Sequence, residues 1–170
     1  MKKYNMLYLK KNLKLSLGLY LVLNGAVCLD SILKSEPVLT VIAKITYFMP
    51  LLVMCLIFML MAYKGFEKSV KKEEKKHNVV FSDNGEILID KKHLIYHTDE
   101  WLIFSGRNAI HFGSVAEISD PFKSADMKVG GEKYSAVVTT DKGKYITVKA
   151  SDPTDLSSLK TAYYKYKENP

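Results

Sequence analysis

Two long apolar stretches separated by only four residues constrain this chain more than any other feature. Residues 15–33 are 19 residues with one charge, Asp30, and residues 38–63 are 26 residues with one charge, Lys44. A helix needs about 20 apolar residues to cross a bilayer. Both stretches therefore predict transmembrane helices, and the short connection at residues 34–37 predicts an antiparallel hairpin.

Lysines flank this hairpin asymmetrically. Only Lys34 and Lys44 lie near the connection. Many more lie outside the other two ends, namely Lys2, Lys3, Lys10, Lys11, Lys14, Lys64, Lys68, Lys71, Lys72, Lys75 and Lys76. Because basic residues near span ends stay on the cytoplasmic side, we predict a multi-pass protein of the cell (inner) membrane with both termini cytoplasmic. A signal peptide is the main alternative for the first stretch.

Polar groups inside the spans are functional candidates, since a charge at the bilayer centre costs roughly 2.5–3.5 kcal/mol. Asp30 and Lys44 flank the connection at similar depth, so an interhelical ion pair is possible. The simpler alternative is that Lys44 reaches the outer surface and Asp30 lies among the headgroups. Pro50 predicts a kink. Cys28 and Cys55 predict apolar fillers rather than a disulfide or a metal site.

The charge of the chain is unevenly divided. Residues 1–77 carry 13 basic and 5 acidic side chains, and the remainder carries 12 and 13. This argues against nucleic acid as a partner, which requires basic charge on the folded domain. Residues 1–14 form a basic N-terminus and residues 64–77 a charged neck. The neck is either a topology signal and spacer or a contact with membrane lipids, made by Lys68, Lys71, Lys72, Lys75 and Lys76.

From residue 78 onward, apolar residues alternate with a period of two. Asn84-Gly85 lies between two extended runs, which is a strong hairpin signal, and residues 141–143 indicate a second hairpin. We expect seven short strands with a loop at residues 121–131, arranged as a sandwich or small barrel. Asp152 and Pro153 then begin a helix. Its apolar stripe is Leu156, Leu159, Tyr163 and Tyr166.

Residues 78–170 resemble the bacterial pleckstrin-homology-like (PH-like) domains, particularly the YcxB-like group. The likeness lies in AIHFGSVAEI (109–118), YSAVVTTDKGKYITV (134–148) and DPTDLSSLKTAYYKY (152–166). It implies an α+β membrane protein, in which a two-helix transmembrane hairpin precedes a seven-stranded antiparallel PH-like barrel capped by a C-terminal helix. PH-like folds imply binding of lipid headgroups, peptides or proteins, and the family has no catalytic signature.

Motifs for catalysis or metal binding are missing from the sequence. His93 and His97 would lie roughly 13 Å apart on a strand, too far to share one ion. Ser105, Ser114 and Ser135 lack the glycines of a nucleophile elbow, and no phosphate-binding loop occurs. We therefore predict no metal, no cofactor and no enzymatic activity. A hydrolase is the least favoured alternative.

Exposed aromatic residues and the single arginine are the candidate contacts. Aromatic and Arg side chains are enriched at binding hot spots, which directs attention to Trp101, Phe122 and Arg107. We predict a membrane-anchored module whose cytoplasmic domain recognises a protein partner or a second copy of itself. The alternatives are lipid sensing, which requires a basic cluster on the domain, and immunity against a membrane-active peptide or toxin.

Overall fold

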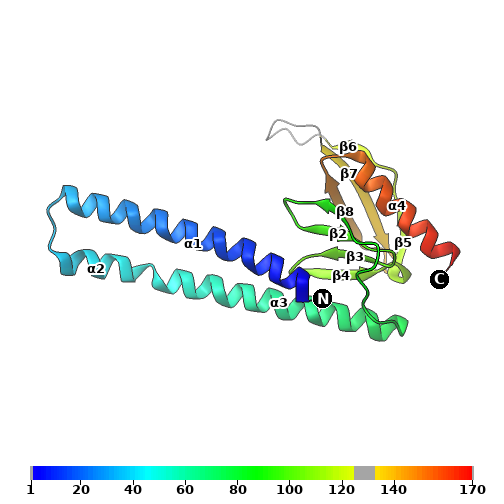
Figure 1. The fold of residues 1–170 in the computed structure, drawn as a ribbon, viewed down its shortest axis with the longest axis horizontal. Coiled ribbons are helices and arrows are strands. Elements are labelled where there is room, and N and C mark those ends of the chain that lie inside the picture. Colours follow the sequence, from blue (N-terminus) through cyan, green and yellow to red (C-terminus); the bar gives the residue numbers. More distant parts are fainter. Residues whose placement is uncertain (1, 125–132, 170) are drawn as a thin grey trace.

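The chain forms a long helical hairpin that carries a domain of β-sheets and one helix at its open end (Figure 1). The structure, a computed structural model, describes residues 2–124 and 133–169. The part of the predicted loop at residues 125–131 lies outside the described residues. The arrangement is α+β, as predicted, with the helical hairpin first and the C-terminal helix last.

The hairpin consists of α1 (Lys2–Leu33) and a second arm made of α2 (Val38–Tyr47) and α3 (Met49–His77). Both arms are long and apolar enough to cross a membrane. The second arm is interrupted at Phe48, two residues before Pro50. Proline lacks a backbone donor and crowds the preceding turn, so the interruption falls where the sequence predicts a kink.

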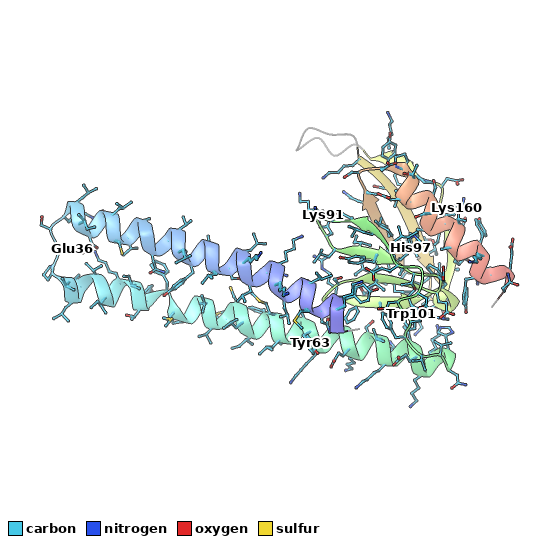
Figure 2. The ribbon with its side chains drawn as sticks, in the orientation of Figure 1. Glu36, Tyr63, Lys91, His97, Trp101 and Lys160 are labelled. Atoms are coloured by element: carbon cyan, nitrogen blue, oxygen red, sulfur yellow. The ribbon has the colours of Figure 1, made fainter. Side chains whose placement is uncertain are left out.

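The connection between the arms has its own ion pairs. Lys44 Nζ lies 2.5 Å from Glu36 Oε2, and Lys34 Nζ lies 2.9 Å from Asp30 Oδ2. The candidate pair between Asp30 and Lys44 is therefore not formed, because each of the two residues has another partner. Lys34 follows Asp30 by one helical turn, and Glu36 lies in the connection, at the closed end shown in Figure 2, within reach of Lys44.

The first sheet is an antiparallel meander of β1 (Ile87–Asp90), β2 (Ile95–His97), β3 (Trp101–Phe104) and β4 (Asn108–His111). All four residues of β3 are buried. Leu102 and Phe104 belong to one apolar cluster, and Trp101 and Ile103 to another. Successive side chains point to opposite faces of a strand, so this sheet is covered on both faces.

The second sheet contains β5 (Val115–Ile118), β6 (Phe122–Ser124), β7 (Lys133–Thr140) and β8 (Tyr145–Ala150). β5 pairs with the C-terminal end of β7, and β6 pairs with its N-terminal end. β8 follows β7 through the predicted hairpin at residues 141–143 and pairs along its length. The 3-10 turn η1 (Phe112–Ser114) separates β4 from β5.

Three strand predictions need correction. Residues 79–83 form no strand, because Phe81 N donates to Glu74 Oε1 and the segment covers the second apolar cluster instead of pairing with β1. Phe122–Ser124, predicted as loop, pairs with β7. The described residues contain eight strands in two sheets that do not close into a barrel, since no strand pairing joins the two sheets.

The C-terminal helix α4 (Pro153–Glu168) is confirmed. Asp152 caps it by accepting a 2.8 Å hydrogen bond from Thr154 N. Leu156, Leu159 and Tyr163 are buried against the first apolar cluster, which lies between α4 and the two sheets. Tyr166 packs on its edge. We call this cluster the inner core.

The second apolar cluster joins the hairpin to the first sheet, and we call it the docking core. The helices supply Tyr4, Phe66 and Val70, and the sheet supplies Tyr96, Trp101, Ile103 and Ala109. Phe66 and Val70 are 0% exposed. The segment predicted as a charged neck, residues 64–77, therefore packs against the first sheet through Phe66 and Val70. The hairpin and the β-sheets meet through a packed interface.

Candidate functional site

A group of basic side chains lies where two β-turns approach α1. The β1–β2 turn supplies Lys91, Lys92 and His93, the β3–β4 turn supplies Arg107, and α1 supplies Lys11. We call these five residues the basic rim. Figure 2 shows Lys91 on the edge of the β domain that faces the closed end of the hairpin, close to the level of Tyr63 along the hairpin. Tyr63 is the last residue of the predicted second span.

Local hydrogen bonds fix the shape of the β1–β2 turn. The carboxylate of Asp90 accepts from the amides of Lys92 at 2.7 Å and His93 at 3.1 Å, and it also bonds to the ring of His93. Burial acts to raise the pKa of Asp90, but the bonds from His93 and Lys92 outweigh it and the pKa is lowered. The carboxylate is thus occupied within the turn, and the side chains of Lys91 and Lys92 remain exposed.

The β3–β4 turn is held against both the other turn and α1. Ser105 N donates to Leu94 O at 3.1 Å, which ties the two turns together. Gly106 has a φ of +68°, and a Cβ added there would lie 2.1 Å from the ring of Tyr8. Only glycine combines this backbone angle with so close an approach. The exposed Arg107 follows directly, so the packing of Tyr8 places the arginine beside α1.

Two adjoining cavities open between these elements. One of about 150 Å³ is lined by α1 and both turns, including Lys11, Lys92 and Arg107. Lys11 Nζ donates to the carbonyl of Lys92 at its edge. The second, of about 170 Å³, is lined by His93, Arg107 and Lys149 among others. No carboxylate is among the described residues that line either cavity. One sign of charge therefore dominates both, which favours an anionic group.

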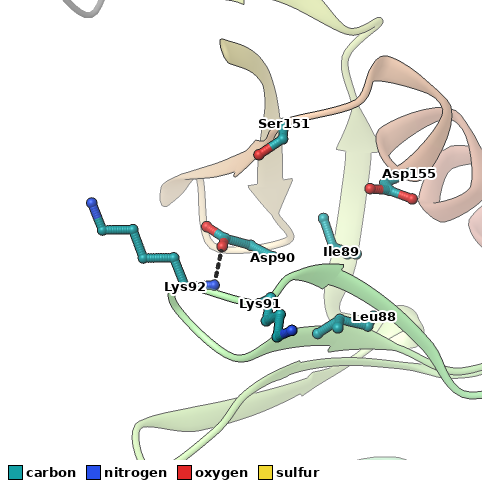
Figure 3. Close-up of a pocket in the computed structure, with 7 residues that line it drawn as sticks. All are labelled: Leu88, Ile89, Asp90, Lys91, Lys92, Ser151 and Asp155. Carbon is teal, nitrogen blue, oxygen red and sulfur yellow. Dashed lines mark hydrogen bonds between the residues drawn. The ribbon is translucent and has the colours of Figure 1, made fainter. Parts of the chain in front are cut away.

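A larger hollow of about 530 Å³ lies beside the rim, between β1 and the start of α4 (Figure 3). Asp90 and Asp155 face it together with Lys91 and Lys92. Burial, and less strongly Asp152, raises the pKa of Asp155. With two carboxylates and two lysines, this hollow has no preference for either sign of charge. Its size alone does not make it the site, and the two smaller cavities carry the stronger electrostatic signal.

The structure separates the predicted site residues. Arg107 lies in the basic rim, and Phe122 is 48% exposed on β6, away from the lining of both rim cavities. Trp101 was predicted as an exposed contact and this is wrong, because its side chain is 0% exposed within the docking core. The predicted lysines of α3 are all exposed, namely Lys68, Lys71, Lys72, Lys75 and Lys76. Two of them, Lys72 and Lys76, line a separate cavity.

Sequence reasoning missed most of the basic rim. Lys91, Lys92 and His93 form a basic run next to a turn, which was a usable signal. The contribution of Lys11 depends on α1 continuing beside the β domain, which no sequence pattern indicates. The histidines lie apart: His93 is exposed, whereas His97 is buried with Nε2 2.9 Å from Ser158 Oγ. Among the described residues, no three His, Cys, Asp or Glu side chains are grouped to hold a metal ion.

No family model, curated protein sequence or solved structure matches this chain. The resemblance to PH-like domains therefore stays a prediction.

Proposed function

We propose that this protein is a non-enzymatic, membrane-anchored binding module that holds its β domain directly on the cytoplasmic leaflet. The hairpin crosses the membrane with both termini in the cytoplasm, and the basic rim contacts anionic lipid headgroups. Two observations carry this proposal. Lys91 lies on the edge of the domain that faces the closed end of the hairpin, close to the level of Tyr63 (Figure 2), and Lys92, His93 and Arg107 line a cavity together with Lys11 of α1.

The packing of the hairpin supports this arrangement. Because Phe66, Val70 and Tyr4 are buried against the first sheet, the domain has no free linker on which to drift from the membrane. Placing the apolar stretch up to Tyr63 in the bilayer brings Lys91, Lys92 and Arg107 to its surface. Each basic residue near an anionic leaflet contributes about 1 kcal/mol. Because the hairpin already anchors the domain, this energy sets the orientation of the domain on the membrane surface.

The local charge also answers the main objection to a lipid-contacting role. The −1 balance of residues 78–170 argues against a basic surface when it is averaged over the domain. In the fold, several acidic groups are paired elsewhere: Asp120 with Lys160 and Asp141 with Lys76. Asp90 pairs with His93 in the basic rim, and the four remaining members, Lys11, Lys91, Lys92 and Arg107, leave the rim with a net positive charge.

Recognition of a protein partner is the second candidate. Phe122 is 48% exposed on β6, which pairs with β7 at the end of its sheet. A large exposed aromatic side chain beside a sheet edge suits docking of another chain. This surface is separate from the basic rim, so one molecule can use both.

The test uses the full chain in nanodiscs of phosphatidylcholine alone or mixed with phosphatidylglycerol. We expect amide hydrogen exchange at residues 91–94 and 105–107 to slow in the anionic discs, and this protection to fade with added salt. The Lys91→Glu/Lys92→Glu variant should lose it. The Lys165→Glu/Lys167→Glu variant, with the same charge change on α4, should keep it. Equal exchange in both lipids would contradict the headgroup contact.

The topology is tested separately with reporter fusions at each terminus. Both should report a cytoplasmic position, because the lysines near those ends of the hairpin favour it. An extracytoplasmic C-terminus would overturn the proposal as a whole.

A further inference from the structure

A second group of lysines surrounds a cavity on the side of the domain where α3 ends. The cavity measures about 230 Å³ and lies between α3, the outer strand β4 and the β7–β8 turn. Lys72 and Lys76 come from α3, and Lys142 and Lys144 come from the turn. These segments are far apart in the sequence, and the docking of α3 on the first sheet brings them together.

Hydrogen bonds at one wall engage both acidic groups of this lysine cavity. Ser114 Oγ donates to Glu73 Oε2 at 2.6 Å, and Lys76 Nζ reaches both Ser114 Oγ at 2.7 Å and Asp141 Oδ2 at 2.5 Å. His77 Nε2 lies 2.7 Å from the same hydroxyl. A hydroxyl has one proton to give, so His77 donates to Ser114. The serine proton goes to Glu73, and this arrangement does not activate Ser114 as a nucleophile.

Three of the four lysines of the cavity have no such partner in the part of the chain that the structure describes. Among the described residues, no hydrogen bond or ion pair engages the ammonium groups of Lys72, Lys142 and Lys144. Asn108 adds a polar side chain to the lining. Four lysines against two carboxylates leave a net charge of +2 around a small hollow. Lysine binds phosphate as a point charge, and several lysines around one cavity match an anion with more than one negative charge.

We propose that the lysine cavity binds a small soluble phosphate-bearing ligand that bridges α3 and the β7–β8 turn. Its volume lies below the usual range for drug-sized ligands, about 300–1,000 Å³, so the ligand is about the size of one phosphorylated group. Lys72 and Lys76 follow Tyr63 by 9 and 13 residues, which places them about 13–20 Å along the helix. A soluble ligand fits this position better than a headgroup held in the leaflet.

The site differs from the lipid-contacting basic rim in residues and in location, and it does not depend on the proposed function. Lys142 and Lys144 are exposed on a turn, so their replacement leaves both apolar cores intact. Variants of these two lysines therefore test binding without a cost in folding, which unchanged emission from Trp101 verifies.

The experiment follows inorganic phosphate and pyrophosphate by ³¹P NMR and calorimetry, with the full chain in phosphatidylcholine nanodiscs. We expect saturable binding that Lys142→Glu/Lys144→Glu weakens at least tenfold. The Lys165→Glu/Lys167→Glu control and the Lys91→Glu/Lys92→Glu rim variant should bind like the unmodified chain. Retained binding in the rim variant separates this result from the lipid-contact proposal.

Three outcomes would overturn the inference. The first is no binding by the unmodified chain up to about 10 mM, weaker than any useful affinity on the usual scale. The second is equal loss in the α4 control, which would indicate general charge attraction. The third is loss of phosphate binding in phosphatidylglycerol nanodiscs but not in phosphatidylcholine nanodiscs at the same low salt, which would identify lipid as the occupant.

Discussion

The inner core and the docking core are both apolar, yet they are built from different parts of the chain. The inner core uses residues from Ile89 to Tyr163, all within the predicted domain. The docking core joins Tyr4 and Phe66, from opposite arms of the hairpin, to the far face of the first sheet. The hairpin is therefore a structural layer of the domain as well as a pair of long apolar arms.

The largest expected effect comes from disrupting the inner core. Leu159 is 0% exposed, so Leu159→Asp loses its packing and buries a carboxylate without a partner. We expect a loss of more than about 5 kcal/mol, close to the whole stability of a small domain. Emission from Trp101, the only tryptophan, should shift to the red in the purified full chain.

Thr161→Asp on the exposed face of α4 is the matched control and should leave the emission unchanged. A native spectrum for Leu159→Asp would mean that α4 does not contribute to the core.

The docking core is tested by Phe66→Ala. Removing a buried phenylalanine costs about 3–5 kcal/mol, and here the cost falls on the contact between α3 and the first sheet. Denaturant titration of the full chain, followed through Trp101, should show this loss. Phe58→Ala, on the same helix but 62% exposed, is the control and should have little effect. Equal effects of the two substitutions would contradict the docking core.

The contrast between the cores explains what the sequence could predict. The inner core depends on period-two strands and on the α4 stripe of Leu156, Leu159 and Tyr163, which local patterns reveal. The hairpin arms were predictable from their apolar length. The docking core was not, because Phe66 and Val70 lie in a lysine-rich segment that reads as solvated. Trp101 was misassigned for the same reason, since its partners come from a distant helix.

In the two candidate sites too, only residues marked by a local sequence pattern were predictable. Arg107 was predicted from its residue type and its position in a turn. Lys11 joins the basic rim, and Lys72 joins Lys142 and Lys144, only through the docking of the helices. A pairing between segments so far apart in sequence has no local signal.

His111 lies between the inner core and the docking core, and a pH titration tests its contribution to stability. His111 is 1% exposed, with its ring 4.8 Å from that of His77 and 4.9 Å from that of Trp101. Burial, with His77 and Lys76 nearby, lowers the pKa of His111 from 6.5 to about 4, against the opposing effect of Glu73. Tyr166 of α4 covers its other side. The folded state thus holds this imidazole neutral.

The sign of the effect follows from the lowered pKa. The unfolded chain binds the proton more readily, so the contribution is complete above pH 6.5 and is lost as the pH falls toward 4. The loss amounts to about 3 kcal/mol, since each pKa unit corresponds to about 1.4 kcal/mol. Denaturant titrations across this window should show a smaller pH dependence for His111→Phe than for the unmodified chain. Identical dependence would contradict the assignment.

The smallest effect concerns two glycines with the same backbone angle. Gly106 and Gly143 have φ values of +68° and +71°, so alanine at either position pays the left-handed cost of about 1–2 kcal/mol. A Cβ at Gly143 meets no atom within 4 Å, whereas one at Gly106 would lie 2.1 Å from the ring of Tyr8. Gly106→Ala must therefore displace α1 from the β3–β4 turn. Forcing an extra methyl group into a packed contact lowers the free energy of unfolding by about 1–3 kcal/mol more. Denaturant titration should give this difference between the two variants, and faster amide exchange at residues 4–8 should accompany Gly106→Ala alone. Equal losses in both would mean that Tyr8 does not hold α1 against the turn that presents Arg107.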